Sequence, residues 1–501
     1  MKILTANQIY QADKATLHQK GITSLDLMEQ AAFQCFDFIQ KNDLFNQKLI
    51  KIFCGVGNNG GDGLVIARYL HKINADVNCY IVHFSDKQTD DFKSNFEKLK
   101  SLNVKIHHIY NETDLPEIQA NELIIDAIFG IGLKKSPDGF TKKLIQQINK
   151  SDAFIISIDL PSGLMLDKTI DDKDAVIKAN KTLTFQVPKL AFLLPENKLF
   201  CSDFEVIDIG LDQDFIHSLA ANHFFTTQSD VQKLYQPRNQ FAHKGNFGHA
   251  LLIGGSYGKI GAITLTSSAA LKIGSGLVTA YIPKCGYEIL QTAIPEVMVE
   301  VDNDTEIHHF NCKTLADVVG IGPGLGLHEK TMEGFINFLK LQKNPMVIDA
   351  DALNILAQNK MSLKDIPKNS VLTPHPKEFE RLAGTWKNDY EKLEKLQKFS
   401  NQYQVVVVLK GAFTVIAYQN ELHFNATGNA ALATAGSGDV LTGIITGLIA
   451  QGYHPFDAAK IGVFIHGKTA DIYTRQFPQE TFTASEILNL LPIAVKEIFY
   501  T

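Results

Sequence analysis

The sequence of 501 residues lacks the features that mark several large classes of protein. It has no long run of Lys and Arg, and its formal net charge is −6, so we expect no nucleic-acid partner. The most apolar helical stretch, residues 440–450, is shorter than the ~20 residues that a membrane span needs. We therefore also expect no segment that crosses a membrane.

Cysteine pairs at short spacing are absent as well. The six cysteines lie far apart and form no Cys-x-x-Cys motif, which is typical of reduced thiols. The N-terminal segment becomes polar after Leu4 and lacks the ~7–15 apolar residues of a signal peptide. Both observations predict a cytoplasmic protein. At ~150 residues per domain, the length predicts two to four domains.

What the sequence does contain is a repeated alternation of strands and helices. In the first half, apolar runs at residues 49–54, 77–83, 123–128 and 153–158 alternate with amphipathic segments. Near-continuous apolar strands between helices predict a parallel sheet that is covered on both faces. Polar residues dominate after Gly210, and the alternation restarts at His249. The sequence therefore predicts an α/β protein of two domains, with a boundary between about Gly210 and His223.

A glycine-rich segment, GVGNNGGDG at residues 55–63, follows the first predicted strand and precedes a helix predicted over residues 63–73. Glycines at such a junction let the backbone approach a phosphate, and the helix N-terminus adds unpaired N–H donors. A dehydrogenase also needs an acidic residue about 20 residues further on, and Asp86 comes late for that role. Asn58, Asn59 and Asp62 add more polar side chains than a hydride-transfer site requires. The segment therefore favours a phosphate-containing ligand and a different reaction.

Polar residues also follow two other predicted strands, in DAIFGIG (residues 126–132) and IDLPSG (residues 158–163). Because the carboxyl ends of parallel strands meet at one edge of a sheet, we expect oxygens of Asn59, Asp126 and Ser162 to meet there. One charged and two neutral ligands suit a monovalent cation better than a divalent one. These strand ends therefore predict a cation site.

Asp159 lies between an apolar strand and Pro161. A carboxylate in that position is partly desolvated and available as a base. The alternative is an aspartate that only caps a turn or a helix. The two neighbouring motifs favour the functional interpretation.

GVGNNGGDG, DAIFGIG and IDLPSG resemble, in this order, the epimerase domain of the bifunctional NAD(P)H-hydrate repair enzymes. The resemblance covers residues 1–215 and implies a Rossmann-like domain that interconverts the R and S epimers of hydrated NADH and NADPH (NADHX and NADPHX). It implies that Asp159 is the catalytic acid and base and that Asn59, Asp126 and Ser162 ligate K⁺. The substrate contacts that it implies are Asn58, Asn59, Gly60, Gly61, Asp62, Gly130, Ile131, Gly132, Leu133, Lys134, Lys135, Ser136 and Asp159.

The strongest motif of the second half is AGSGD, residues 435–439, directly before the apolar helical stretch. Small residues at a helix start can form an anion hole for a phosphoryl group in transfer. Asp439 is placed to take a proton from an attacking hydroxyl, and an ordinary aspartate pKa of ~3.9 leaves it ionised at pH 7. The alternative is a first-turn aspartate that only stabilises the helix dipole.

Three further segments support a nucleotide site. KGAFT, residues 410–414, supplies a cation and a hydroxyl in the turn of a predicted hairpin, and GIGPGLG, residues 320–326, follows a predicted strand. His375 precedes a first-turn proline, where a histidine is more often a helix cap than a ligand. By itself, Lys410 is typical of a solvated lysine at a strand end.

An acidic cluster follows the strand predicted at residues 345–348. Asp349, Asp351 and Asn354 lie where they could reach Mg²⁺ through water. The alternative is a polar turn between a strand and a helix.

SYGKIGAITL, GIGPGLG, DADALN, LTPHPKEFERL, KGAFT and AGSGDVLTG resemble, in this order, the ribokinase-like dehydratase domain of the same repair enzymes. The resemblance covers residues 224–501 and implies that ADP, with Mg²⁺, phosphorylates the C6 hydroxyl of the (S)-hydrate, after which loss of phosphate regenerates NAD(P)H. Asp439 would be the base, and we expect a homo-oligomer. The implied hydrate contacts are Ala262, Gly324, His375 and Asp439, and the implied nucleotide contacts are Lys410, Gly411, Ala412, Phe413, Thr414 and Gly438.

Three other interpretations stay open. The first is a ribokinase-superfamily small-molecule kinase with an accessory Rossmann-like domain, which GSGD would serve equally well. The second is a Rossmann-like scaffold of an RNA-processing protein, which the negative net charge disfavours. The third is a dehydrogenase, for which the first half offers no hydride-acceptor site.

Overall fold

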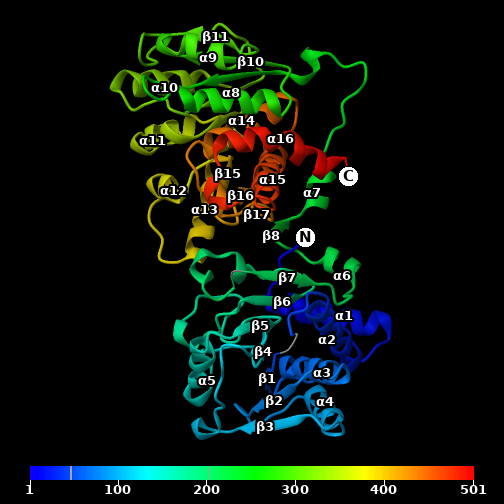
Figure 1. Ribbon diagram of the computed structural model, residues 1–501. Coiled ribbons are helices and arrows are strands. Elements are labelled where there is room, and N and C mark those ends of the chain that lie inside the picture. Colours follow the sequence, from blue (N-terminus) through cyan, green and yellow to red (C-terminus); the bar gives the residue numbers. More distant parts are fainter. Residues whose placement is uncertain (46–47, 202, 501) are drawn as a thin grey trace. The chain divides into compact units, whose positions relative to one another are not determined.

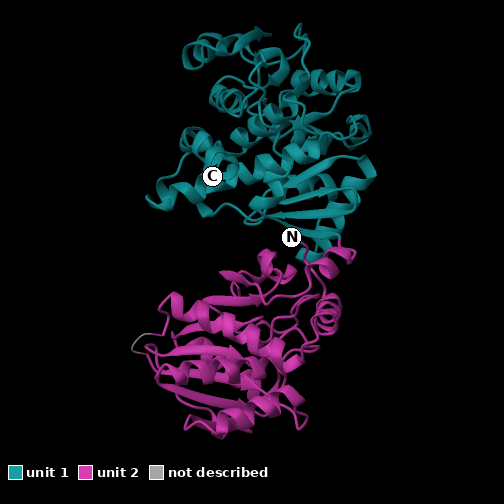
Figure 2. Cartoon of the chain, turned by 90° about the vertical axis from the view of Figure 1, so that its right-hand side faces the viewer, with its two compact units in different colours: residues 1, 222–501 teal, residues 2–221 magenta. Residues whose placement is uncertain are grey.

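The computed structural model of the chain describes residues 1–45, 48–201 and 203–500. The chain divides into two compact units: the first is Lys2–Ala221, and the second consists of Met1 and the residues from Asn222 onward (Figure 2). Met1 belongs to the second unit because its amino group donates a hydrogen bond to the carbonyl of Phe225 (2.9 Å) and pairs with Asp230 (3.0 Å). The first unit thus extends past residue 215, through helix α6, to Ala221.

The first unit contains a seven-stranded sheet in the order β3-β2-β1-β4-β5-β6-β7, and every pair of neighbouring strands is parallel. The order reverses between β1 and β4, so their carboxyl ends open a crevice where ligands bind in such sheets. The strands are Ile50–Gly55 (β1), Val77–Val82 (β2), Lys105–Ile109 (β3), Leu123–Ala127 (β4), Phe154–Ile158 (β5), Lys181–Phe185 (β6) and Phe204–Ile207 (β7).

Helices cover both faces of this sheet (Figure 1). Buried residues of the first four helices form one hydrophobic core with the sheet, and Leu144, Ile145 and Ile148 of α5 form a second core. The predicted parallel sheet with two covered faces is thus confirmed. The helices are Ala6–Lys20 (α1), Ser24–Lys41 (α2), Asn58–Lys72 (α3), Asp90–Lys100 (α4), Gly139–Lys150 (α5) and Gln213–Ser218 (α6).

The second unit contains a ten-stranded sheet in the order β11-β10-β9-β12-β13-β14-β15-β16-β17-β8. Only β16 runs against its neighbours among these strands, because β15, β16 and β17 form consecutive antiparallel pairs. The strands are His223–Thr226 (β8), His249–Ile253 (β9), Leu277–Ile282 (β10), Met298–Val301 (β11), Val318–Ile321 (β12), Met346–Ile348 (β13), Val371–Leu372 (β14), Val406–Leu409 (β15), Val415–Tyr418 (β16) and Glu421–Asn425 (β17). The hairpin predicted around the KGAFT turn is confirmed by the β15–β16 pair.

Four helices of the second unit, α8, α14, α15 and α16, pack against one another, and α14 also contacts the central strands β9, β12 and β13. The close approach of α14 to α8 needs Gly443, because a Cβ there would lie 2.1 Å from the carbonyl oxygen of Thr266. The helices are Gln228–Gln232 (α7), Ile260–Lys272 (α8), Tyr287–Ala293 (α9), Glu329–Leu341 (α10), Ala350–Gln358 (α11), Pro376–Ala383 (α12), Asp389–Tyr403 (α13), Ser437–Ala450 (α14), Pro455–Tyr473 (α15) and Ala484–Phe499 (α16).

Two motifs that the sequence places in loops belong to helices. Residues 58–62 form the first turn of α3, which begins after the N-cap Gly57, and residues 437–439 form the first turn of α14. The predicted starts at residues 63 and 440 were wrong because small and polar residues carry no helical periodicity. The first-turn position directs the N–H groups of both motifs toward the carboxyl edge of the sheet.

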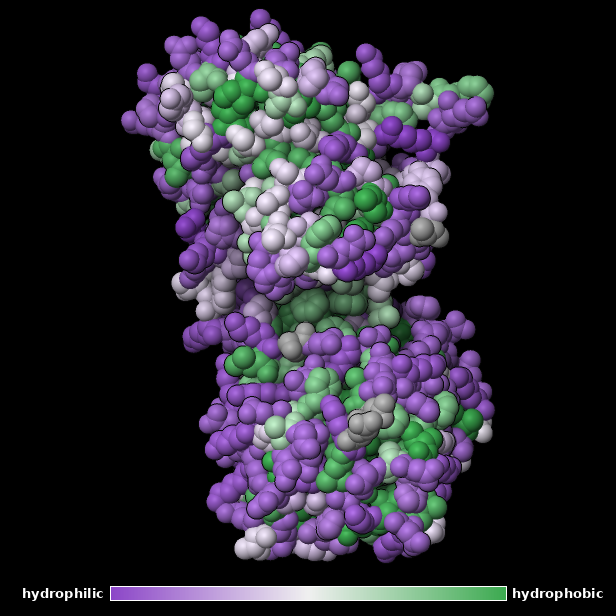
Figure 3. Space-filling model, in the orientation of Figure 1, coloured by the Kyte–Doolittle hydropathy of each residue, from purple (hydrophilic) through white to green (hydrophobic). Residues whose placement is uncertain are grey.

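Three further features of the structure concern the length of its apolar helices, the hydropathy of its surface and the state of its cysteines. Within the described residues, no helix combines the length and apolarity that crossing a membrane requires. On the face drawn in Figure 3, hydrophilic residues predominate and hydrophobic residues form small groups among them. All six cysteines are free thiols.

Candidate active sites

A cavity of about 630 Å³ opens in the first unit where β1 and β4 diverge. Eleven of the thirteen predicted substrate contacts line it: Asn58, Asn59, Asp62, Gly130, Ile131, Gly132, Leu133, Lys134, Lys135, Ser136 and Asp159. Ser136 Oγ is buried in this wall and has no hydrogen-bond partner among the described residues. A buried hydroxyl without a partner is costly, so a ligand that hydrogen-bonds it would be favoured.

Gly60 and Gly61 are not among the residues that line the cavity, and their lack of a side chain is needed for packing. Ligand contact through their backbone stays a prediction. A Cβ on Gly60 would lie 1.6 Å from the carbonyl oxygen of Gly55, and a Cβ on Gly61 would lie 2.6 Å from the sulfur of Met28. Their lack of a side chain lets α3 begin directly against β1 and α2. These two glycines therefore set the position of Asn59 and Asp62.

The three predicted cation ligands gather around the backbone of Phe129. Asn59 Nδ2 donates to the Phe129 carbonyl (3.1 Å), and Ser162 Oγ accepts a hydrogen bond from the Phe129 N–H (2.8 Å). Asp126 Oδ2 accepts hydrogen bonds from Ser157 Oγ (2.7 Å) and from Ser162 N–H (2.8 Å). Burial raises the pKa of Asp126, and these hydrogen bonds oppose that shift. The carboxylate, hydroxyl and carbonyl oxygens, with the Asn59 amide turned to present its oxygen, fit a hard monovalent cation.

Asp159 occupies a conformation that few non-glycine residues adopt, with φ of +62°. Its Oδ1 forms an ion pair with Lys189 Nζ (3.1 Å) and accepts hydrogen bonds from Phe185 N–H (3.2 Å) and Thr184 Oγ1 (3.4 Å). Among the described residues these contacts all fall on Oδ1, which leaves Oδ2 as the atom that can exchange a proton with a ligand in the cavity. Asp159 is therefore held by the unit and not merely a turn cap.

Three carboxylates, Asp13, Asp62 and Asp159, line this cavity, and Asp159 forms an ion pair with a buried lysine. Burial and the charge of Asp159 raise the pKa of Asp13 to about 6, whereas Lys189 lowers it. Burial, Asp159 and Asp13 also raise the pKa of Asp62 well above its usual value. The Lys189 side chain is only 1% exposed, and its Nζ also donates to the carbonyls of Phe185 (2.8 Å) and Val187 (3.2 Å).

Asp13 and Lys189 were not predicted from the sequence. Asp13 lies on α1, a helix that was not predicted because its sequence is largely polar and its apolar stripe is weak. Lys189 stands alone in the apolar segment VPKLAFLL, residues 187–194, which follows β6. A lone lysine in such a segment is a signal of a buried partner, because an unpaired ammonium is rarely buried.

In the second unit, AGSGD forms the start of α14, with Gly436 as a left-handed N-cap (φ +84°). His466 of α15 is buried against this turn, and its Nε2 lies 3.1 Å from both the Oγ and the carbonyl oxygen of Ser437. Burial raises the pKa of Asp439 to about 6, and the charge of Asp349 acts in the same direction. The first turn thus combines free N–H donors with a carboxylate that takes up protons more readily than usual.

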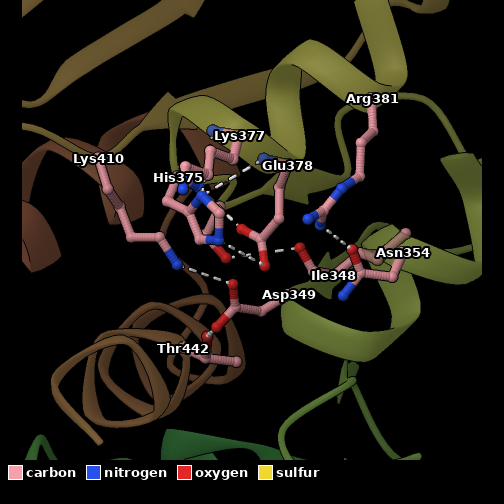
Figure 4. Close-up of polar contacts among 10 residues, drawn as sticks. Ile348, Asp349, Asn354, His375, Lys377, Glu378, Arg381, Lys410 and Thr442 are labelled. Carbon is pink, nitrogen blue, oxygen red and sulfur yellow. Dashed lines mark hydrogen bonds and ion pairs between the residues drawn. The ribbon is translucent and has the colours of Figure 1, made fainter. Parts of the chain in front are cut away.

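Asp349 anchors the neighbouring cation. Its Oδ1 pairs with Lys410 Nζ (3.0 Å) and its Oδ2 accepts a hydrogen bond from Thr442 Oγ1 (2.7 Å), as Figure 4 shows. The prediction of a solvated Lys410 was wrong, because its side chain is only 24% exposed and is held by a buried carboxylate. A Cβ on Gly438 would lie 3.2 Å from Lys410 Nζ, so the glycine gives the ammonium group room beside the helix start.

The other two residues that were predicted near Mg²⁺, Asp351 and Asn354, also have protein partners. Asp351 Oδ2 accepts a hydrogen bond from Gly326 N–H (2.8 Å) and lies 3.6 Å from Lys259 Nζ. Asn354 accepts a hydrogen bond from Arg381 (2.7 Å; Figure 4). A carboxylate oxygen with one protein partner keeps a second lone pair, so Asp349 and Asp351 stay able to reach Mg²⁺ through water. Asp351 and Asp439 also fit a hydrated Mg²⁺ on a nucleotide.

Two of the predicted hydrate contacts, Ala262 and Gly324, lie at the point where β9 and β12 diverge. A Cβ on Gly324 would lie 3.2 Å from the Cβ of Ala262, and the Gly324 carbonyl accepts a hydrogen bond from Ser256 Oγ (2.8 Å). His375 is the N-cap of α12, where its Nδ1 accepts hydrogen bonds from Lys377 N–H (3.1 Å) and Glu378 N–H (3.3 Å; Figure 4). The alternative of a helix cap is thus confirmed for His375, and burial lowers the pKa of its ring.

The predicted nucleotide contacts, residues 410–414, form the turn between β15 and β16. Thr414 Oγ1 donates to the Gly411 carbonyl (3.2 Å), which closes the turn next to Lys410. The turn and the first turn of α14 therefore meet at the Lys410 ammonium group, beside Gly438.

Both units match families of known proteins. A family described as NAD(P)H-hydrate dehydratase matches residues 250–492, and one described as YjeF-related protein N-terminus matches residues 24–191. A bifunctional NAD(P)H-hydrate repair enzyme of Moorella thermoacetica is 36% identical, over 99% of this chain and 97% of that protein. The corresponding enzyme of Escherichia coli is 34% identical, over 97% of this chain and 92% of that protein.

This chain belongs to the bifunctional NAD(P)H-hydrate repair enzymes. The repair enzyme is also similar to solved structures over its second unit. An ADP/ATP-dependent NAD(P)H-hydrate dehydratase from Bacillus subtilis, co-crystallised with ATP and Mg²⁺, is 30% identical. That match covers 56% of this chain and 100% of the other, with a TM-score of 0.48.

Removal of the Lys189 ammonium group should destabilise the repair enzyme in a way that depends on pH. Lys189→Met should lower the free energy of unfolding by about 3 kcal/mol at pH 8, because it leaves buried carboxylates without their cation. This loss in the free energy of unfolding should be smaller at pH 5. Asp13 and Asp62 have raised folded pKa values and take up protons as the pH falls, which removes their repulsion. Urea unfolding at both pH values measures the difference.

The matched control is Lys181→Met. Lys181 is 17% exposed and pairs with Asp203 outside the cavity, so its loss should cost less than about 1 kcal/mol at either pH. An equal cost of Lys189→Met at pH 8 and pH 5 would contradict the account.

Proposed function

We propose that the repair enzyme returns both epimers of hydrated NADH and NADPH to NADH and NADPH. The first unit interconverts the R and S epimers, and the second unit dehydrates the S epimer. The observation that carries the proposal is that one chain, matching bifunctional relatives almost end to end, holds two separate carboxylate sites. The hydrate forms as both epimers and the dehydratase uses one, so the two activities together convert all of the hydrate. A cytoplasmic location and a homo-oligomer stay predictions.

In the first unit, the hydrate binds in the cavity between β1 and β4, with its phosphates toward the first turn of α3. Asp159 is the acid and base, because epimerisation needs a group that takes the proton of the C6 hydroxyl as the bond from C6 to the ring nitrogen opens, and returns it when the ring closes on the other face. Lys189 holds Oδ1 of Asp159, and Oδ2 exchanges the proton. Asp13 supports this role, since a neighbouring carboxyl with a pKa of about 6 carries a proton part of the time near neutral pH.

K⁺ is the cation that we propose for Asn59, Asp126 and Ser162. A bound monovalent cation neutralises the fully buried Asp126 carboxylate and fixes the turn after β4 that carries residues 130–136. Its role is to position the cavity wall.

In the second unit, Asp439 takes the proton of the C6 hydroxyl while that oxygen attacks the terminal phosphoryl group of the nucleotide. Lys410 and the N–H groups of the first turn of α14 stabilise the charge that develops on the phosphoryl oxygens. Mg²⁺, when bound, screens the phosphate charges, and Asp351 and Asp439 are the carboxylates that would hold its hydration shell. Phosphate then leaves C6, the ring loses a proton, and dihydronicotinamide forms. We propose ADP as the donor, giving AMP.

Two substitutions separate the activities. Wild-type enzyme with an R/S mixture of hydrated NADH, ADP, Mg²⁺ and K⁺ should convert both epimers, followed by the absorbance of the dihydronicotinamide ring and by phosphate release. Asp159→Asn should stop after consuming the S epimer. Asp439→Asn should still exchange the epimers. It should lower the rate of dehydration by about 10²-fold or more, so that no NADH is detected. A stable phosphorylated product without phosphate release would support a small-molecule kinase instead.

Cation replacement tests the K⁺ site. Exchange of K⁺ for Li⁺ should slow epimer exchange by about tenfold or more, because the smaller ion fits the ligands poorly. Dehydration of the purified S epimer should not change, which serves as the internal control. Asp126→Asn should remove the response to K⁺, and equal exchange rates in both salts would refute the site.

A further inference from the structure

A cluster of metal-binding side chains lies in the second unit, outside the residues placed in the two sites above. Glu306 and His308 belong to the segment after β11, and His328 is the N-cap of α10. One ligand atom from each residue lies within 4.8 Å of the other two. No step of epimerisation or dehydration uses these residues.

Two of the three spacings between the ligand atoms are those of a metal site. Glu306 Oε2 lies 3.3 Å from His308 Nε2 and 3.5 Å from His328 Nδ1. Around a tetrahedral Zn²⁺ with bond lengths of ~2.0–2.1 Å, neighbouring ligand atoms lie about 3.3 Å apart. The two imidazole rings are nearly parallel, with centroids 5.3 Å apart and an interplanar angle of 22°. A small shift of the side chains therefore suffices to place one ion among the three atoms.

The surroundings orient one of the ligands. The Nδ1 atom of His308 is hydrogen-bonded to the side-chain amide of Asn303, so its Nε2 faces Glu306. A partner on the second ring nitrogen of a metal-binding histidine fixes the ring and its tautomer. With the Asn303 amide turned to present its oxygen, Nδ1 carries the proton and Nε2 keeps its lone pair for the metal.

The backbone of this segment is also held in place. Tyr257 N–H donates to the Thr305 carbonyl (2.9 Å), Lys284 N–H to Asn303 (2.8 Å) and Cys285 N–H to Asp304 (2.8 Å). Three hydrogen bonds to other segments fix the loop that supplies two of the ligands. A preformed loop lowers the entropy cost of binding an ion.

We propose that Glu306, His308 and His328 bind one divalent transition-metal ion of the zinc class. Two imidazole nitrogens and one carboxylate oxygen match Zn²⁺, and they leave a fourth position for water. The ion ties the segment after β11 to the start of α10, which directly follows the glycine loop that contains Gly324. The site is thus a structural clamp beside the predicted hydrate contact. The proposal does not depend on the proposed reactions.

The test uses the full chain, stripped with a chelator and then kept in saturating Mg²⁺ and K⁺. Zn²⁺ is titrated against a chromophoric chelator, and Co²⁺ is added separately to read the coordination geometry from its visible spectrum. We expect one equivalent of tight binding, a tetrahedral Co²⁺ spectrum and a higher melting temperature with Zn²⁺. Glu306→Gln, His308→Ala and His328→Ala should each weaken Zn²⁺ binding by about tenfold to a hundredfold.

The matched control is His309→Ala, which removes the neighbouring histidine. The His309 ring pairs with Asp302 (3.0 Å) and is not among the three ligands, so this variant should bind Zn²⁺ like the wild type. Zn²⁺ binding that is equally strong in the three ligand variants, or an octahedral Co²⁺ spectrum, would overturn the proposal. An absence of binding by the wild-type protein would overturn it as well.

Discussion

Each unit depends on the ion pair between a buried or half-buried lysine and a carboxylate at the carboxyl edge of its sheet. Lys189 serves Asp159 in the first unit, and Lys410 serves Asp349 in the second. A carboxylate taken out of water is tolerated only when it is paired, hydrogen-bonded or protonated. Burial and the charge of a neighbouring aspartate make other carboxyls at these edges hold their protons more tightly, as for Asp13 and Asp439. The same burial and repulsion that cost stability supply acid and base groups near neutral pH.

The two sites share a physical plan although their folds differ. In each sheet the order of the parallel strands reverses once, between β1 and β4 or between β9 and β12, and the loops after these strands form the site. A helix that begins with small residues, α3 or α14, directs its N–H groups at the place where phosphates would lie. What differs is the chemistry that we propose: proton exchange by a carboxyl in the first site, and phosphoryl transfer assisted by a carboxyl and a cation in the second. One chain can thus carry two successive reactions on one cofactor.

The sequence predicted the architecture and the motifs better than their surroundings. The buried strands β1, β2, β4 and β5 were found because they are mostly apolar, whereas β3 was missed because it is an edge strand with exposed polar residues. Motif residues such as Asn59, Asp126 and Ser162 were expected to meet, and the structure brings them together. Lys189 and Asp13 could not be placed, since their partners come from segments far apart along the chain. Gly60 and Gly61 stay predicted ligand contacts, but the structure shows a packing role that the sequence did not indicate, because backbone and Met28 occupy the space of a side chain.

The most direct test of this account is the pH dependence of dehydration by the wild-type enzyme, with the pure S epimer as substrate. Burial and neighbouring carboxylates raise the pKa of Asp439 to about 6, and the base must be ionised to take a proton. We predict that kcat/KM is constant above neutral pH and falls by about tenfold per pH unit below pH 6. Nucleotide binding, measured in parallel, should persist there. A value of kcat/KM that stays level down to pH 5 would contradict the claim that crowded carboxylates set the chemistry of this site.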